Sequence, residues 1–233
     1  MASYLLRRSG IAVGLVAEVL GWRADLVIQV GVGNRHQEVD VLSSEWPGVR
    51  FVGYEPHPGI IKGLRDEYPG EIHQLAMSDF NGPGVLFAKK CHGDGSSLVP
   101  TSDPNILTFE VRVRTLDSMF CEEEIRAMLN ERILLWVDCE GRELEALKGG
   151  EKILRLVDVV NVEMTSHPPE PGWSKTTDIH SYLVEQGFMA QWVHTQRIGA
   201  GQTDFVYVRP QLFKPDYCCF PWEVERFNEM RRT

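Results

Sequence analysis

Short apolar runs of strand length alternate with amphipathic segments along most of the chain. These runs predict five buried strands, at residues 26–30, 51–54, 72–76, 133–137 and 157–162. Periodic patterns bounded by turn residues predict helices at residues 36–46, 60–68, 143–154 and 178–186. Two later runs, residues 188–193 and 205–208, can pair as a terminal hairpin. This order of elements predicts an α/β fold with a parallel sheet and helices on both faces.

The alternation is interrupted in the middle of the chain. Residues 81–84, Asn-Gly-Pro-Gly, have the composition of a turn, and short strands are predicted at residues 85–88 and 109–115. The segment between these strands, residues 91–105, is rich in Gly, Ser, Asp and Pro. A loop of this length inside a compact domain is usually functional or mobile, so we expect part of it to close over an acceptor.

Composition fits one domain with a sizeable core. The 233 residues are 43% hydrophobic, and we expect a helical segment at 1–24, an α/β core at 25–209 and an extension at 210–233. The net charge of -9 disfavours broad nucleic-acid binding, because an acidic surface repels phosphate backbones. No stretch approaches the ~20 apolar residues needed to span a membrane. The five cysteines show neither zinc-ligand nor disulfide spacing, which favours reduced thiols and a cytoplasmic location.

The candidate site follows from the sheet, because open parallel sheets bind ligands beyond the carboxyl ends of their strands. After the first strand comes Gly31-Val32-Gly33, where glycines allow a tight turn and close approach of a ligand to the backbone. After the second strand come Glu55 and Pro56, and a carboxylate at that point can accept hydrogen bonds from both ribose hydroxyls. Glu55 follows Gly33 at close to the ~20 residues expected of a nucleoside site.

The neighbouring positions bear on which adenosine cofactor binds. The NAD fingerprint needs a third glycine at position 36, where this chain has His36. A methyl donor carries no pyrophosphate and tolerates a bulkier residue there. After the third strand, Met77 can pack on the adenine ring, and Ser78 or Asp79 can accept from its amino group. The alternative is a plain turn leading into Asn81.

Seven sequence blocks in a fixed order carry a family resemblance. They are Gln29-Val30-Gly31; Tyr54-Glu55-Pro56-His57-Pro58; Ala76-Met77-Ser78-Asp79; Gly95-Ser96-Ser97-Leu98; Val113-Arg114-Thr115-Leu116-Asp117; Val137-Asp138-Cys139-Glu140-Gly141-Arg142-Glu143 with Leu147-Lys148-Gly149-Gly150; and Val162-Glu163. In the order and spacing of these blocks, from about residue 26 to residue 209, the chain resembles the FkbM-type S-adenosylmethionine-dependent methyltransferases. The first loop departs from the family's usual Gly-Ala-Asn-x-Gly, and many members carry Asp at the position of Gln29.

The resemblance implies a fold, a cofactor and a substrate class. The fold is the Rossmann-like class I methyltransferase fold, a seven-stranded, mostly parallel sheet with an antiparallel last strand. The implied reaction is O-methylation of a hydroxyl on a sugar or complex natural product, with S-adenosylhomocysteine as the product of the cofactor. Ten residues are expected to hold that cofactor: Gln29, Gly31, Gly33, Glu55, Pro56, Met77, Ser78, Asp79, Asp138 and Glu140.

The acceptor side is expected at the ends of the fourth and fifth strands. Asp138 and Glu140 follow the fourth strand, where Asp138 can face the donor or the acceptor, or can cap the turn before Glu143. Glu163 ends the fifth strand, and a buried acid there needs a hydrogen-bonding or charged partner. His167, in the following loop, has the ordinary pKa best suited to a general base at neutral pH. We expect Asp138, Glu163 and His167 to be the catalytic residues.

Several alternatives remain open at this level. Asp138, Glu140 and Glu163 could instead bind a divalent cation, but their spacing is not that of a dense ligand set and we expect no metal. The chain could be a non-catalytic module that kept a nucleoside pocket, or an NAD-dependent oxidoreductase, which His36 disfavours. The leading prediction is an O-methyltransferase with a small-molecule or glycan acceptor, on whose sugar face Trp173 could stack.

Overall fold

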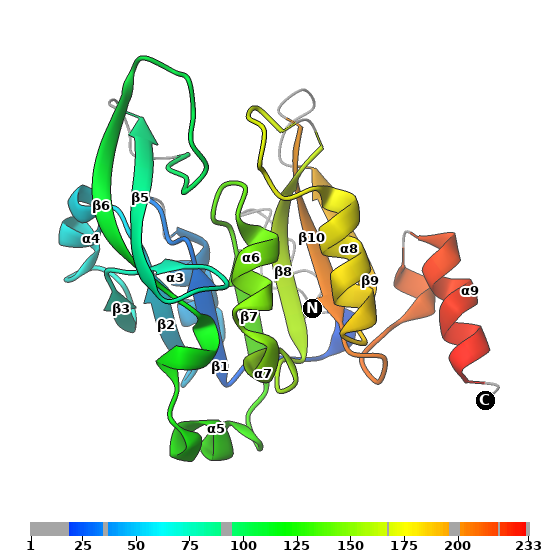
Figure 1. Cartoon of the computed structure of the whole chain (residues 1–233). Coiled ribbons are helices and arrows are strands. Elements are labelled where there is room, and N and C mark those ends of the chain that lie inside the picture. The colour runs from blue at the N-terminus through cyan, green and yellow to red at the C-terminus, as the bar shows by residue number, and fades with distance from the viewer. Residues whose placement is uncertain are drawn as a thin grey trace.

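A seven-stranded sheet forms the middle of the molecule (Figure 1). The computed structural model describes residues 19–34, 37–89, 95–166, 168–195, 201–218 and 220–231. The expected N-terminal helical segment, up to residue 18, and the candidate base His167 lie outside these ranges. The strands of the sheet are, in spatial order, β3 (Glu71–His73), β2 (Arg50–Tyr54), β1 (Leu26–Val30), β7 (Ile133–Val137), β8 (Val159–Thr165), β10 (Gln202–Val208) and β9 (Met189–Thr195).

The pairing of these strands confirms the predicted fold. All neighbours from β3 across to β8 are parallel, whereas β10 is antiparallel to both β8 and β9. The result is a mostly parallel sheet whose last strand along the chain is antiparallel. Because β10 runs in reverse, it begins at the edge where the parallel strands end.

The two central strands show why the sequence predicts the sheet so directly. Every side chain of β1 and β7 is buried, including the polar side chain of Gln29. A parallel strand covered on both faces needs such a continuous apolar run rather than an alternating one. The observed bounds of both strands coincide with the predicted ones.

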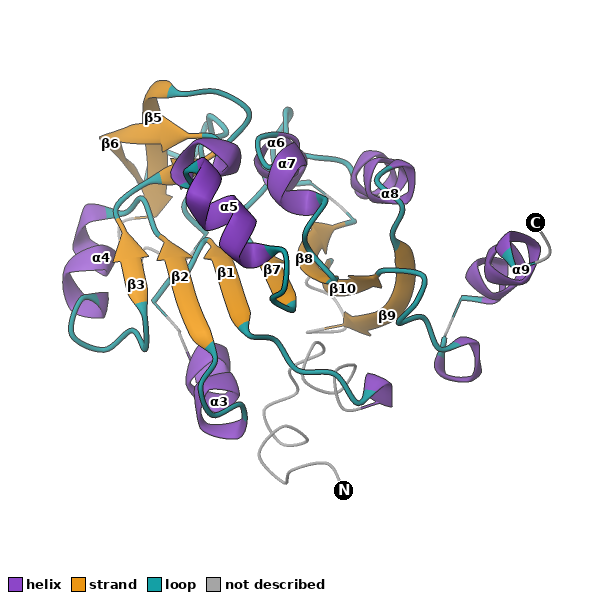
Figure 2. Cartoon of the chain, turned by 90° about the horizontal axis from the view of Figure 1, so that it is seen from below, coloured by secondary structure: helices purple, strands orange, loops and turns teal. Residues whose placement is uncertain are grey.

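Helices cover both faces of the sheet (Figure 2). One face carries α5 (Glu122–Met128), α6 (Glu143–Lys148), α7 (Glu151–Leu154) and α8 (Thr176–Glu185), with the 3-10 turn η1 (Leu116–Met119). On the other face lies α3 (Gln37–Glu45), and α4 (Pro58–Leu64) packs beside edge strand β3. Two apolar cores result, one built around Ile28 and Leu147 and one around Val27 and Leu42.

A second, three-stranded sheet corrects the expectation of one third strand at residues 72–76. That stretch divides into β3 of the main sheet and β4 (Ala76–Met77), which pairs with β6 (Ile106–Arg114) in the order β4-β6-β5. β5 (Gly82–Lys89) and β6 form a longer antiparallel hairpin than predicted. One of its faces is open to solvent and carries polar residues, so hydrophobicity alone marks only part of each strand.

Backbone groups at the amino edge of the main sheet are tied together by Arg209, which follows β10. Its guanidinium donates to the carbonyl oxygens of Val157, at 2.9 Å, and Gln186, at 2.7 Å, and also to that of Leu154. The same group lies 3.9 Å from the ring centre of Phe188. One side chain therefore joins the ends of α7 and α8 to the start of β8.

The chain ends in η2 (Pro215–Tyr217) and α9 (Pro221–Met230), which lies beyond β9 at one end of the molecule (Figure 1). Arg226 holds this helix in place, since it pairs with buried Glu223 at 3.0 Å and donates to the Phe188 carbonyl oxygen at 2.8 Å. Trp222 stays 57% exposed on the outer side. Among the residues that the structure describes, no helix has the length and apolar character to cross a membrane.

Candidate active site

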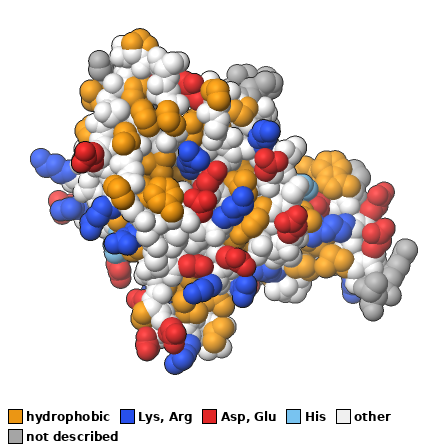
Figure 3. Space-filling model, in the orientation of Figure 1, with side chains coloured by type: hydrophobic (Ala, Val, Ile, Leu, Met, Phe, Trp, Pro, Cys, Tyr) orange, Lys and Arg blue, Asp and Glu red, His pale blue; other side chains and the backbone are white. Residues whose placement is uncertain are grey.

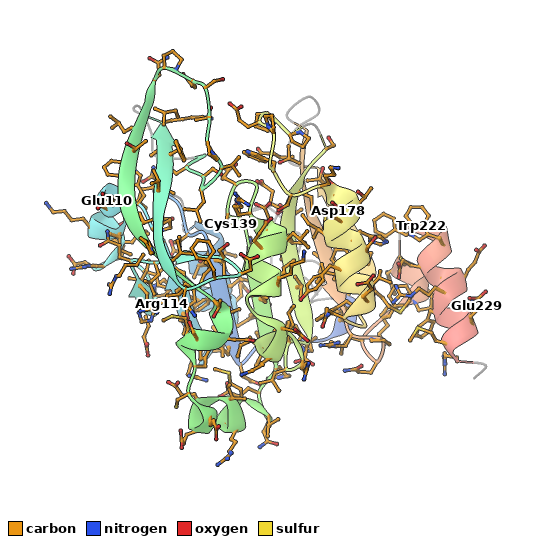
Figure 4. The ribbon with its side chains drawn as sticks, in the orientation of Figure 1. Glu110, Arg114, Cys139, Asp178, Trp222 and Glu229 are labelled. Atoms are coloured by element: carbon orange, nitrogen blue, oxygen red, sulfur yellow. The ribbon has the colours of Figure 1, made fainter. Side chains whose placement is uncertain are left out.

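Five strand ends and the start of β10 meet at the carboxyl edge of the main sheet. The residues after β1, β2, β7 and β8 lie there, and Cys139, after β7, is labelled near the centre of this edge in Figure 4. The β5–β6 hairpin rises beside this edge (Figure 1). The meeting of these elements brings the predicted cofactor loop and the predicted acidic residues into one region.

The first loop depends on a glycine at position 31. Gly31 has φ +78°, and a Cβ built on it would lie 1.6 Å from the carbonyl oxygen of Asp138. The backbone of the loop therefore rests directly on the residue that follows β7. Gly33 also has a positive φ, of +65°, but nothing lies within 4 Å of a Cβ built there. Position 31 requires glycine for both contact and conformation, and position 33 for conformation alone.

Glu55 joins the first two loops. Its side chain is 4% exposed, and its two carboxylate oxygens accept from the amides of Gly33, at 2.8 Å, and His57, at 2.7 Å. Pro56 lies between Glu55 and His57 and fixes the turn that allows the second contact. The carboxylate that was predicted to bind ribose thus also sets the position of the glycine loop.

His57 has a structural role that the sequence did not reveal. Its Nδ1 accepts from the amides of Gly59 and Ile60, which caps the start of α4, and its ring packs edge-on against Phe109 of β6 with ring centres 5.0 Å apart. Because Nδ1 accepts, the ring must be neutral and must carry its single proton on Nε2. Burial lowers the pKa of His57, in agreement with that form.

Gln29, expected at the cofactor, has its side chain buried in the sheet. Its Oε1 accepts from the hydroxyl of Tyr68 at 3.2 Å. The ring of Tyr68 stands against Gly53 of β2, where a Cβ would lie 2.8 Å from the ring carbon that bears the hydroxyl. The Tyr68 contact supports the end of β1 from below the loop.

The third predicted block lies where the small sheet meets the helical layer. Met77 and Ser78 are buried, and the Ser78 hydroxyl donates to Asp79 at 3.2 Å. A Cβ built on Gly149 would lie 2.0 Å from the Ser78 carbonyl oxygen. The Gly149-Gly150 break between α6 and α7 therefore lets the helical layer approach the block expected at the adenine.

Three carboxylates gather at the ends of β7 and β8, where Glu163 was expected to end its strand but lies two residues before the last residue of β8. Asp138, Glu140 and Glu163 each place one oxygen so that all three oxygens lie within 4.8 Å of one another. Glu140 adopts a left-handed backbone, φ +53°, which is rare for a residue other than glycine. Gln202, the first residue of β10, donates from Nε2 to Glu163 at 3.0 Å and to Glu140 at 3.4 Å.

The cluster retains protons at neutral pH. Burial, then the charge of Glu163, raises the pKa of Asp138 well above its usual range. Burial and the charges of Glu140, Asp204 and Glu143 raise the pKa of Glu163 to about 8, and a hydrogen bond from Asp138 opposes that rise. Asp138 is therefore the hydrogen-bond donor of the pair, and Glu163 is the acceptor.

Glu143 supports the loop that carries these acids. Its carboxylate, buried in the protein, accepts from the amides of Gly141, at 2.8 Å, and Cys139, at 3.3 Å. Burial raises the pKa of Glu143 to about 7 in spite of these contacts. The predicted capping of this turn by Asp138 is thus carried out by Glu143.

Two loops enclose the cluster. Ser97 donates from its hydroxyl to the Glu140 carbonyl oxygen at 2.5 Å. On the other side, the ring of Trp173 lies where a side chain on Gly141 would stand, since a Cβ there would be 2.3 Å from the indole. Thr101 donates to Glu170 at 2.5 Å, which joins the two loops. The segments expected to close over the acceptor therefore contact each other and the loop after β7.

The structure brings together most of the predicted site residues. Gly31, Glu55, Asp138, Glu140 and Glu163 lie at one edge. Two residues with defined contacts were missed: Tyr68, whose partner Gln29 is distant in sequence, and Gln202. Gln202 was missed because the candidate residues follow strand ends, whereas Gln202 begins a strand that only the strand order places at the site.

The sheet order and the site at its carboxyl edge define a Rossmann-like protein of the class I methyltransferase fold. The sequence model of the FkbM methyltransferase domain matches residues 24–189, and the chain belongs to this family. A search of curated proteins found no match.

The solved structures to which this chain is similar share little sequence with it. An FkbM methyltransferase from Methylobacillus flagellatus KT superimposes with a TM-score of 0.51 at 13% identity, covering 79% of this chain and 43% of that one. This chain thus spans less than half of that protein. Magnesium protoporphyrin IX methyltransferase from Synechocystis PCC 6803, solved with S-adenosylmethionine bound, gives 0.42 at 13% identity, covering 90% and 85%. Fibrillarin from Aeropyrum pernix, also in complex with S-adenosylmethionine, gives 0.46 at 11% identity, covering 86% and 76%.

Proposed function

We propose that the protein transfers the methyl group of S-adenosylmethionine to a hydroxyl of a carbohydrate or related natural product. The observation that carries this proposal is the position of the carboxylate cluster directly beside the cofactor loop. Gly31 packs against the Asp138 backbone, so a donor lying over Gly31 and Gly33 reaches the cluster without further rearrangement. Membership of the FkbM methyltransferase family supports the reaction type.

The donor is held in this proposal by the loops after β1, β2 and β4. Glu55 exchanges one or both amide contacts for the ribose hydroxyls, and Met77, Ser78 and Asp79 line the adenine. Asp138 and Glu140 face the methionine end. Gln29 acts from beneath the loop through its buried contact with Tyr68.

The chemistry is an in-line displacement at the sulfonium methyl. The acceptor oxygen attacks the methyl carbon, the carbon–sulfur bond breaks, and its electron pair leaves on sulfur as S-adenosylhomocysteine. The hydroxyl proton passes to Glu163, which ends as a neutral carboxyl. Positioning supplies much of the rate, and the base adds roughly 10²–10⁴-fold.

Glu163 is favoured over the other candidate bases for two reasons. It is held close to Asp138 and Glu140, and its pKa of about 8 makes it a stronger base than an ordinary carboxylate. The positive sulfonium of a bound donor lowers that pKa and favours the anion. His167 remains a candidate on sequence grounds alone.

Titration calorimetry with S-adenosylhomocysteine tests the cofactor site. Glu55→Ala should weaken binding by about 10–100-fold, because hydrogen bonds to a charged group contribute about 1.5–3 kcal/mol. Glu67→Ala, on the surface beyond α4, is the matched control and should bind as the unaltered protein does. Equal affinity in Glu55→Ala would refute the placement of the ribose.

Transfer of labelled methyl groups to a panel of sugars and hydroxylated natural products tests the reaction. Glu163→Gln should lose about 10²–10⁴-fold in kcat with donor affinity retained. A protein that binds the donor but methylates nothing in the panel would favour the non-catalytic module, and binding of NAD in place of the donor would favour the oxidoreductase.

A further inference from the structure

Gln202 meets the carboxylate cluster from a direction that no other described strand offers. Because β10 is antiparallel, its first residue lies at the edge where β7 and β8 deliver their last residues. Gln202 pairs in register with Thr165, two residues beyond Glu163 on β8. Its side chain lies between the loop after β7, which carries Glu140, and the end of β8, which carries Glu163, and its amide nitrogen donates to both carboxylates.

The amide is chemically suited to this position. Glu163 faces Glu140 in the loop after β7, Asp204 on β10 and Glu143 at the start of α6, and the charges of these three acids oppose its ionisation. Asp138, after β7, is the fourth acid, and its hydrogen bond to Glu163 favours the ionised form. A hydrogen-bond donor favours the charged form of its acceptor, and an uncharged donor does so without forming an ion pair that would make the carboxylate a weak base. The two N–H groups of a primary amide can serve two carboxylates at once.

We propose that Gln202 is a positioning residue for methyl transfer, whose side-chain amide holds the Glu163 carboxylate beside Glu140 in its proton-accepting state. The inference rests on the proposed function in assigning Glu163 as the base. It adds a residue from the antiparallel strand to a site otherwise built from the ends of parallel strands. Gln202 itself does not exchange a proton with the acceptor.

Gln202→Met tests this proposal, because methionine has a similar length and no donor. Carbon-13 NMR of the glutamate side-chain carboxyls, in the complex with S-adenosylhomocysteine, follows Glu163 directly and needs no acceptor. The Glu163 titration should move to higher pH by about one unit, a tenfold change in the ionisation constant. Glu163→Gln identifies the resonance.

The pH profile of kcat/KM gives the second readout. The acidic limb of this profile should move to higher pH by the same unit. Gln202→Met should therefore be about tenfold slower near neutral pH, and its kcat/KM should recover at high pH. Gln202→Glu replaces the donor with a further acid and should shift the limb more. A role in folding alone would lower activity equally at every pH.

Gln191→Met is the matched control. Gln191 is a buried strand glutamine on β9 whose amide exchanges hydrogen bonds with the backbone of Lys214, at 2.8 and 3.1 Å, in the C-terminal segment. Its loss should lower thermal stability and leave the Glu163 titration in place.

The two proposals fail in different ways. A Glu163 titration unchanged by Gln202→Met would overturn the role of Gln202, whatever the activity. A Glu163→Gln variant with full activity would overturn the assignment of the base, while the NMR titration still decides whether Gln202 controls Glu163.

Discussion

The contact between Gly31 and the Asp138 carbonyl gives a prediction with an internal control. In Gly31→Ala, the new methyl group would stand 1.6 Å from that oxygen, about half of an ordinary contact, and the backbone would keep φ +78°. The left-handed conformation costs an alanine about 1–2 kcal/mol, and relief of the overlap adds about 1–3 kcal/mol. Gly33→Ala has φ +65° with open space around it, so it bears only the first cost.

Thermal unfolding of the two variants measures the contact by difference. With about 2 kcal/mol of added cost, and 2–4 °C of Tm lost per kcal/mol in a chain of this size, Gly31→Ala should melt about 4–8 °C below Gly33→Ala. Because the displaced residue is Asp138, Gly31→Ala should also lose affinity for S-adenosylhomocysteine. Melting temperatures within about 1 °C of each other would show that β1 and β7 do not meet at this point.

Four further expectations follow from particular contacts. Asp117 accepts from the amides of Lys152 and Ile153, in the first turn of α7, at 3.0–3.1 Å, so Asp117→Ala should cost about 0.5–2 kcal/mol in urea unfolding and Asp117→Asn less. Arg132 lowers the pKa of Asp25 to about 2, so this pair stabilises the fold above about pH 4, and the stabilisation is lost as the pH falls through 2. Both groups are exposed, so solvent screening limits the loss of stability in Asp25→Asn at pH 7 to about 1 kcal/mol or less. Binding of S-adenosylmethionine at pH 7 should release more protons than binding of S-adenosylhomocysteine, which lacks the sulfonium charge; calorimetry in buffers of different ionisation enthalpy measures the difference, and Glu163→Gln should reduce it. A chelator should leave methyl transfer unchanged; loss of activity that magnesium restores would favour a cation between the carboxylates.

The sequence predicts those parts of the site that follow buried parallel strands. β1 and β7 are covered on both faces, so their apolar runs stand out, and Glu55 and Asp138 are the first charged residues beyond such runs. For these residues, coming directly after a buried parallel strand in the sequence means lying at the carboxyl edge of the sheet. The glycines at 149 and 150 were recognised as a break in a helix, but the reason for them is contact between distant segments, since Gly149 approaches Ser78 and Gly150 approaches Leu116.

Residues that do not follow a buried parallel strand were missed for a physical reason. Gln202 is the first residue of its strand, and only the reversed direction of β10 brings it to the carboxyl edge. The β5–β6 hairpin was predicted too short at β5 because Gly82, Pro83 and Gly84 have the composition of a turn, yet they pair with Val113, Arg112 and Val111 of β6. Figure 3 shows how charged and apolar side chains mix on this face of the molecule.

Arg209 has a consequence for how the molecule can change over evolution. It satisfies three carbonyl groups at the edge opposite the site and anchors the last strand against two helices. That end is held by contacts that depend on one another, so substitutions there are costly together. The loops at the other end contact one another through side chains such as Ser97 and Thr101. Selection for a new acceptor can therefore change these loop side chains together, while the frame beneath them stays the same.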